Sequence, residues 1–216
     1  MSSAGPLGRS TGQIRCRQIR CRKVRSKIVV SGAAREGPDD YRTDMVEIAP
    51  ITPADIESFH RTLDLVARER RYLSFTVAPP LDSTRAFVLD MIARHYPQLV
   101  ARSAGEVVGW CDVTPKSGPI DARIGVLGMG LLPQFRHQGI GSRLMARALA
   151  DARAFGFSRV ELTVYRSNEN AIRLYEKAGF VIKAVQPAEA PGDAVDRTVL
   201  IMALSLELPD AFQHRR

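Results

Sequence analysis

Residues 134–144, which read Gln-Phe-Arg-His-Gln-Gly-Ile-Gly-Ser-Arg-Leu, decide the fold of this chain. Gly139 and Gly141 stand at the beginning of a stretch in which apolar residues recur at helical spacing. Glycine lets the backbone come close to a ligand, and the first N–H groups of a helix have no partner within the helix. These donors lie at the positive end of the helix dipole, where phosphate binds well. The stretch therefore predicts a helix start that suits a phosphate group.

Two other phosphate-binding motifs are excluded at defined positions. The P-loop needs the pattern GxxxxGK[ST], and the chain contains no such string. The dinucleotide motif GxGxxG, read from Gly139, has Leu144 where its third glycine belongs. Read from Gly128, the same motif has Pro133 at that place. On the residues alone, glycines that only permit close packing remain an alternative to a phosphate loop.

The surrounding pattern predicts a mixed α/β domain. An antiparallel hairpin comes first, and an alternation of strands and helices follows it, an order that favours a mixed sheet with helices on both faces. Thr52, Pro53 and Asp55 are typical of the start of the first helix. Residues 72–81, which contain Pro79 and Pro80, and the proline- and glycine-rich residues 186–192 are expected to form loops. We expect strands near residues 46–51, 99–103, 107–113, 124–132, 159–165, 181–185 and 199–206, and helices near 52–70, 82–96, 139–154 and 169–178.

The positive charge belongs to one end of the chain. The 216 residues carry a net charge of +8, and residues 1–37 hold nine Lys or Arg against the single Glu36, which leaves the remainder neutral. Residues 13–17 repeat as 18–22, a low-complexity feature typical of a disordered segment. We therefore expect a basic, disordered extension at 1–44, a domain at 45–207 and a tail at 208–216. A start at Met45, a targeting peptide and a nucleic-acid arm are alternatives for the extension.

Cysteine usage and hydropathy limit the class of protein further. Cys16, Cys21 and Cys111 form neither a CxxC pair nor a cluster with zinc-ligand spacing, so we expect no disulfide framework and no metal site. No segment has the ~18 consecutive apolar residues of a membrane span. We expect a cytoplasmic protein without a membrane partner, in which nucleic acid is contacted through the basic extension if at all.

Two blocks of the sequence resemble the GCN5-related N-acetyltransferase (GNAT) superfamily. Residues 134–144 are similar to the family's R/Q-x-x-G-x-G/A signature, and residues 168–180, Asn-Glu-Asn-Ala-Ile-Arg-Leu-Tyr-Glu-Lys-Ala-Gly-Phe, resemble its second block. The resemblance runs from about residue 46 to 206. It implies a central, mostly antiparallel twisted sheet of about six or seven strands, about four helices on both faces, and splayed strands at an acetyl-CoA site.

The resemblance also implies roles for single residues. Leu131 and Leu132 match the splayed backbone that pairs with the pantetheine arm of acetyl-CoA, the co-substrate. Asn168 matches an asparagine that contacts the cofactor near its pantetheine, although it also suits the N-cap of a helix. Tyr175 matches the general acid for the departing thiolate, with a packed aromatic as its alternative. The resemblance implies that the pyrophosphate is bound by Arg136, which begins the signature, and by the backbone amides of His137, Gln138, Gly139, Ile140, Gly141 and Ser142.

The proton acceptor of the reaction stays open. Transfer needs a neutral amine, and an alkyl amine of pKa ~10.4 is mostly protonated at neutral pH. Many family members carry a carboxylate on the glycine-rich strand, whereas residues 124–132 hold none. Glu161, Glu69, His60, Asp112 and a water chain are the candidates, and each residue also has an ordinary surface or core role as its alternative. Cys111 reads as buried packing, so we expect the amine to attack the thioester directly.

The acceptor is the least determined part of the function. The residues after the signature are similar to bacterial members that act on free amino acids and related amines, so we expect a small-molecule primary amine. A protein N-terminal or lysine acetyltransferase is the alternative within the class. A non-catalytic acyl-CoA sensor and a nucleic-acid-binding protein are the alternatives outside it. We also allow for a homodimer.

Overall fold

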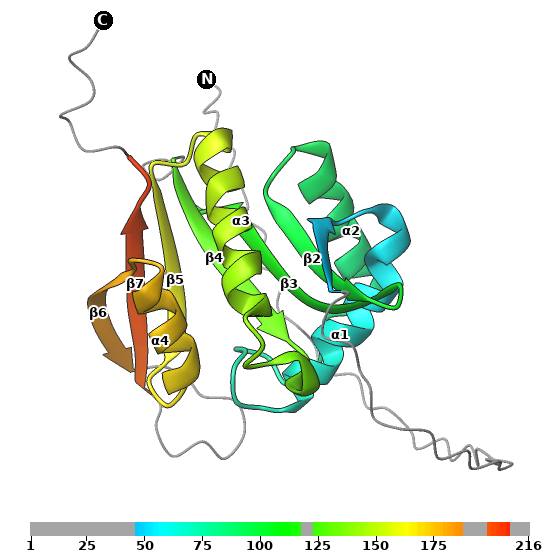
Figure 1. Cartoon of the computed structure of the whole chain (residues 1–216), viewed down its shortest axis with the longest axis horizontal. Coiled ribbons are helices and arrows are strands. Elements are labelled where there is room, and N and C mark those ends of the chain that lie inside the picture. The colour runs from blue at the N-terminus through cyan, green and yellow to red at the C-terminus, as the bar shows by residue number, and fades with distance from the viewer. Residues whose placement is uncertain (1–45, 118–122, 188–197, 208–216) are drawn as a thin grey trace, which may run out of the picture. The chain divides into compact units, whose positions relative to one another are not determined.

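The computed structural model describes residues 46–117, 123–187 and 198–207. Within these ranges the chain forms a seven-stranded sheet and four α-helices (Figure 1). The strands are β1 (Glu47–Pro50), β2 (Gln98–Ser103), β3 (Glu106–Pro115), β4 (Ile124–Leu131), β5 (Arg159–Tyr165), β6 (Val181–Pro187) and β7 (Thr198–Ser205). The helices are α1 (Ile56–Arg68), α2 (Leu81–Ala93), α3 (Ile140–Phe155) and α4 (Glu169–Lys177), with short 3-10 turns η2 (Pro53–Asp55) and η3 (Pro133–Phe135).

The strands lie in the order β1-β2-β3-β4-β5-β7-β6. All neighbouring strands are antiparallel except β4 and β5, which are parallel. A parallel pair needs a crossover connection, and α3 provides it between these two strands. The predicted mixed, mostly antiparallel sheet of six or seven strands is confirmed.

Different helices cover the two faces of the sheet. On one face Trp110 of β3 packs edge-on against Phe59 of α1, with ring centroids 5.7 Å apart. On the other face the side chains of Val113 and Phe157 both lie over Gly125, and Phe157 follows the end of α3. Figure 1 shows α3 crossing one face while α1 and α2 lie against the opposite one. The helices therefore lie on both faces, as the pattern predicts.

The predicted elements differ from the observed ones mainly at their ends. The first helix begins with a turn of 3-10 helix, where Thr52 donates both its N–H and its hydroxyl to Asp55 Oδ2 at 2.7 Å. Residues 186 and 187 extend β6, although we expect them in a loop. Several expectations lie outside the described residues: the extension 1–44, the rest of the 186–192 loop and the tail 208–216. No helix in the described ranges has the length and apolar character to cross a membrane.

The contact between β4 and β5 is short. Residues 124–126 pair with 159–161, and beyond these positions the two strands do not pair. The other edge of β4 stays paired with β3 up to Leu131, and the other edge of β5 stays paired with β7 up to Tyr165. The sheet therefore opens along the second half of both strands, and this opening positions the candidate site.

Candidate active site

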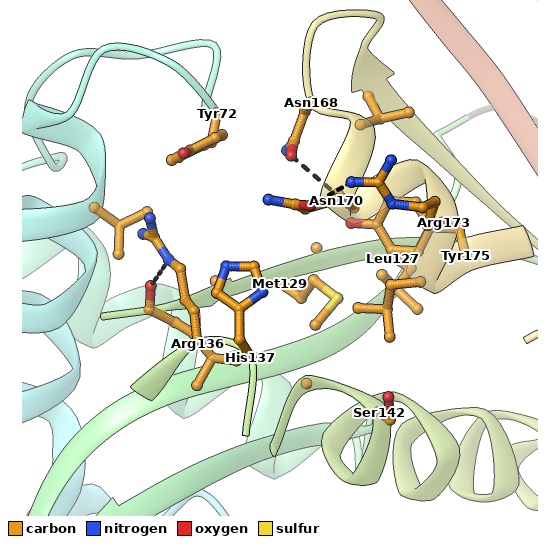
Figure 2. A pocket seen from close by; sticks show the side chains of 18 of the residues that line it. Tyr72, Leu127, Met129, Arg136, His137, Ser142, Asn168, Asn170, Arg173 and Tyr175 are labelled. Atoms are coloured by element: carbon orange, nitrogen blue, oxygen red, sulfur yellow. Dashed lines mark hydrogen bonds between the residues drawn. The ribbon is translucent and has the colours of Figure 1, made fainter. Parts of the chain in front are cut away.

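A cavity of about 510 Å³ lies where β4 and β5 diverge. Its wall is formed by β4 and β5, the loop before α3, the first turn of α3, the end of α1 and the segment after it, and α4 with the residue before it (Figure 2). This volume is typical of a site for a small ligand or cofactor. Of the residues predicted for the site, those on the cavity wall are Leu131, Arg136, His137, Gly139, Gly141, Ser142, Asn168 and Tyr175.

Three predicted residues are not on the cavity wall. Leu132 is buried, and its N–H donates to the carbonyl of Val108 at 2.9 Å. Ile140 belongs to the hydrophobic core. Gln138 is exposed and donates its side-chain amide to the carbonyl of Gln134 at 2.8 Å. The roles predicted for these residues concern their backbone groups rather than their side chains. For Ile140 and Gln138 these roles stay predictions. The N–H of Leu132 already has a partner within the protein, so this group is not free to pair with the pantetheine arm.

The loop before α3 has a backbone that exposes its donors. His137 and Gly139 both have positive φ, 62° and 77°, so the chain turns sharply before the helix. The first helical hydrogen bond that we find joins Arg143 N–H to the carbonyl of Gly139 at 3.1 Å. The N–H groups of the first three helical residues, Ile140, Gly141 and Ser142, consequently have no acceptor within the helix. The predicted helix start with unpaired N–H groups is therefore present, and anion binding by these groups stays a prediction.

Arg136 connects this loop to α1. Its guanidinium donates from Nη1 to Glu69 Oε2 at 2.8 Å, and its Nε donates to the carbonyl of Leu131 at 2.9 Å. The same group lies 4.9 Å from the centre of the Tyr72 ring, within the range of a cation–π contact. In Figure 2 the side chain of Arg136 lies below Tyr72. The charge of Arg136 is thus directed at Glu69, and the residue fixes the loop rather than pointing a free cation at the cavity.

The start and the middle of α4 form the opposite side of the cavity. Asn168 is the N-cap of α4, and its side chain accepts a hydrogen bond from Ala171 N–H at 3.3 Å. Tyr175 is 7% exposed and packs its ring 5.9 Å from that of Phe180. Burial, with a smaller contribution from Cys111, raises the pKa of the Tyr175 hydroxyl above its ordinary value. Tyr175 is therefore a protonated residue of the cavity wall.

The structure adds residues that the sequence did not identify. Asn170, Arg173 and Lys177 on α4 line the cavity, and Arg173 Nη2 donates to Asn170 Oδ1 at 2.6 Å. Their spacing of three and four residues places them on one helix face, a signal that was available once Asn168 had been placed at the helix start. Tyr72 also lines the cavity, yet nothing in its local sequence distinguishes it.

Three of the four candidate proton acceptors are engaged elsewhere. Glu161 accepts from Lys116 at 2.9 Å and pairs with Arg159 at 2.8 Å. Burial would raise the pKa of the Glu161 carboxyl, but these two cations outweigh it and lower the pKa. Glu69 binds Arg136, and the ring of His60 makes a 2.9 Å hydrogen bond to the carbonyl of Pro79. None of the three is on the cavity wall.

Asp112 is not on the cavity wall either, but it differs from these three residues in its surroundings. It is 9% exposed on β3, and we find no hydrogen bond or ion pair to its carboxyl group among the described residues. Burial raises the pKa of the Asp112 carboxyl from 3.8 to about 7.

Cys111 is fully buried in the core, as expected, and both burial and the neighbouring Asp112 raise the pKa of its thiol. A thiol without thiolate character is a weak nucleophile. In the described part of the chain no group of three His, Cys, Asp or Glu side chains is arranged to hold a metal ion.

Comparison with known proteins assigns the family. The model of the acetyltransferase (GNAT) family matches residues 63–180, more than half of the chain. Both sequence blocks and most of the cavity wall lie within this match. The chain therefore belongs to the GNAT acetyltransferase family.

Relatives with curated names extend this comparison. A mycothiol acetyltransferase from Propionibacterium freudenreichii is 33% identical over 96 residues, which cover 43% of this chain and 30% of that protein. A phosphinothricin N-acetyltransferase from Streptomyces viridochromogenes is 29% identical over 145 residues, 64% of this chain and 75% of the relative. The chain spans less than a third of the length of the mycothiol acetyltransferases that it matches.

Solved structures show the same fold. The structure of yncA from Salmonella typhimurium, solved with its cofactor acetyl-CoA, matches with a TM-score of 0.71 at 20% identity. The match covers 78% of this chain and 99% of that one.

Proposed function

We propose that this protein transfers the acetyl group of acetyl-CoA to a primary amine of a small molecule. The observation that carries the proposal is the cavity at the opening of the sheet. There the unpaired part of β4 meets the first turns of α3 and α4. A strand edge and two helix starts offer backbone groups for an extended amide-containing arm and an anionic group at the same place.

Features of the cavity suit the pantetheine arm and the pyrophosphate of acetyl-CoA. The free edge of residues 127–131 suits the two amides of the pantetheine arm, which we expect to lie beside it like an added strand. The N–H groups at the start of α3 suit the pyrophosphate. Lys177 adds positive charge at the α4 side of the cavity, where Arg173 is paired with Glu169 at 3.3 Å. A structural neighbour with the same fold contains acetyl-CoA, which supports this assignment.

The reaction itself needs few groups of the protein. Acetyl-CoA supplies an activated thioester whose carbonyl carbon an amine attacks. Tyr175 is protonated and on the cavity wall, and we expect its hydroxyl group to donate to the departing sulfur. Direct attack by the amine is favoured over an acetylated enzyme because Cys111 is buried and its pKa is raised.

The small size of the acceptor is supported by the relatives. Their names specify mycothiol, phosphinothricin and L-amino acids, all small molecules. A solved neighbour is named as a ribosomal-protein-alanine N-acetyltransferase, so a protein N-terminus is the second candidate acceptor. The cysteine usage of the chain supports a reducing compartment, the cytoplasm, as the place of the reaction.

A thiol-release screen tests the proposal. Purified full chain is mixed with acetyl-CoA and a panel of free amino acids, polyamines and short peptides, and free CoA thiol is followed with a chromogenic disulfide. We expect release above background with at least one amino acid or polyamine, and formation of its N-acetyl product by mass spectrometry. Release with peptides alone would favour a protein acceptor. Binding of acetyl-CoA without release for any amine would favour a sensor.

A further inference from the structure

One row of residues across the sheet is polar in an otherwise apolar region. Gln98 on β2, Asp112 on β3 and Gly128 on β4 are register partners, and register partners point to the same face. This is the face that carries Trp110, two residues from Asp112, and that α1 covers. The row therefore runs from beneath the helices to Gly128, which lies on the cavity wall.

Gly128, at the end of the row, is on the cavity wall, whereas Asp112 lies behind it and is not itself a residue of the wall. A Cβ atom on Gly128 would lie 3.1 Å from Asp112 Oδ1, so the space that a side chain would fill is next to the carboxyl group. The neighbouring Gly130 differs, because its Cβ would overlap the Trp110 ring at 2.3 Å. Beside β4, Gly128 thus leaves room for an atom within hydrogen-bond distance of Asp112, whereas the room at Gly130 is filled by an aromatic ring.

Asp112 is not engaged as a structural ion pair. The buried residues of α1 and α2 are uncharged. Asp112 raises the pKa of the Cys111 thiol, which is the preceding residue on β3. On the same strand pair, Arg102 of β2 is bound to Asp55. Gln98 is 4% exposed, and within the described part of the chain its amide nitrogen and oxygen have no hydrogen-bond partner. A buried carboxyl group and a buried amide without partners cost stability, which indicates a purpose other than packing.

We infer that Asp112 accepts the proton of the acceptor amine through the space beside Gly128, in place of the carboxylate that β4 lacks. The inference rests on the proposed function. As the amine nitrogen bonds to the acetyl carbon, the carbon–sulfur bond breaks, and the thiolate, which accepts a hydrogen bond from Tyr175, takes a proton from solvent. The surplus proton on nitrogen passes to Asp112 Oδ1 and then to water, which leaves the carboxylate ready for the next cycle. A carboxyl group that ionises near neutral pH suits this role, since it is ionised before attack and can hold the proton after it.

The test compares Asp112→Asn with two other variants. Asparagine has the same shape but accepts no proton, whereas Glu161→Gln removes a carboxylate that binds Lys116 and Arg159 away from the cavity. Gly128→Ala keeps Asp112 and places a methyl group between it and the cavity. Each variant is assayed with the best amine of the thiol-release panel. It is also assayed with an acyl hydrazide of similar carbon skeleton, in which the hydrazide group takes the place of the amino group. The nitrogen of a hydrazide is neutral throughout the pH range tested, so its own ionisation does not shape the profile.

We expect Asp112→Asn to lower kcat/KM by about a hundredfold or more at pH 8. With the hydrazide, we expect the activity of the original chain to fall as the pH falls through about 7. The pH profile of Asp112→Asn should lack this decrease, the acidic limb of the profile. Gly128→Ala lowers kcat/KM in the same direction, Glu161→Gln keeps it, and acetyl-CoA affinity is unchanged in Asp112→Asn.

An Asp112→Asn variant that keeps its rate and its pH limb within about twofold would overturn the inference alone. If the original chain transfers acetyl to no amine and no hydrazide, both the proposed function and the inference fail.

Discussion

Tyr175 shows how the environment of a residue changes what it can do. The residue is buried in the core and lies on the cavity wall, and burial raises the pKa of its hydroxyl group. Full transfer of its proton would leave a buried phenolate, which is costly, so we expect Tyr175 to act mainly by donating a hydrogen bond to the sulfur.

We predict that Tyr175→Phe lowers kcat for acetyl transfer at least about tenfold, because the donor to the departing sulfur is lost. Acetyl-CoA affinity should change little, since the ring and its packing remain. Thiol-release kinetics and isothermal titration with acetyl-CoA measure the two quantities. Tyr96→Phe is a matched control, because Tyr96 packs against Phe155 and is not on the cavity wall. Unchanged turnover in Tyr175→Phe would contradict the predicted role.

The cost of burying Asp112 predicts a pH-dependent effect on stability. The folded state holds its proton up to a pKa of about 7, whereas the unfolded chain releases it near 3.8. Between these values the folded state binds more protons, so stability falls as pH rises, by up to roughly 4 kcal/mol for this group. Asp112→Asn removes the ionisable group and with it this loss.

We therefore expect Asp112→Asn to gain stability relative to the original chain as the pH rises from about 4 to about 8. Urea unfolding at pH 4, 6 and 8 measures the difference. If the two stability curves run parallel over this range, Asp112 ionises normally in the folded protein and the argument fails.

At the scale of elements, local sequence patterns predicted where helices start, whereas contacts between residues distant in sequence were not predicted. The start of α3 and the block at α4 were predicted because glycine, cap and helix signals lie within a few residues. The pairing of Gln98, Asp112 and Gly128 was not predicted, because register depends on three strands that are distant in sequence. The contact of Tyr72 with Arg136 was missed for the same reason.

Asn168 has a structural role at the start of α4 and a predicted role in binding. Asn168→Ala removes the cap and should cost about 1 kcal/mol of unfolding free energy, whereas Asn168→Ser keeps a capping oxygen and should cost a few tenths. Both variants lose the amide that we expect to contact the cofactor, so both should bind acetyl-CoA more weakly. Thermal unfolding and titration with acetyl-CoA separate these effects. Normal affinity in the serine variant would leave Asn168 with the capping role alone.

At the scale of the molecule, the described core draws its members from residues 46–206. The sheet, the cavity and the family match all lie within these bounds. The net positive charge of the chain, by contrast, is carried by residues 1–37.

We predict that a chain beginning at Met45 keeps its unfolding temperature within a few degrees and its kcat/KM for acetyl transfer within about twofold. Any affinity of the full chain for nucleic acid should disappear with the deletion, because the remaining charge is near neutral. Calorimetry, the thiol-release assay and fluorescence anisotropy with a labelled oligonucleotide measure the three properties. A large loss of stability would show that the extension is part of the folded unit.

The three-residue contact between β4 and β5 joins two half-sheets, β1 to β4 and β5 to β7, by few hydrogen bonds. A ligand that pairs with the free edge of β4 and contacts α4 would link these two halves and stabilise the sheet for as long as it is bound. The enzyme would then be most rigid when loaded and most prone to open when its co-substrate is scarce. Amide hydrogen exchange should slow on both sides of the joint when acetyl-CoA is added. At a concentration of about 100 times Kd, the gain in stability should approach roughly 2.7 kcal/mol. The rigidity of the sheet would therefore depend on the concentration of acetyl-CoA.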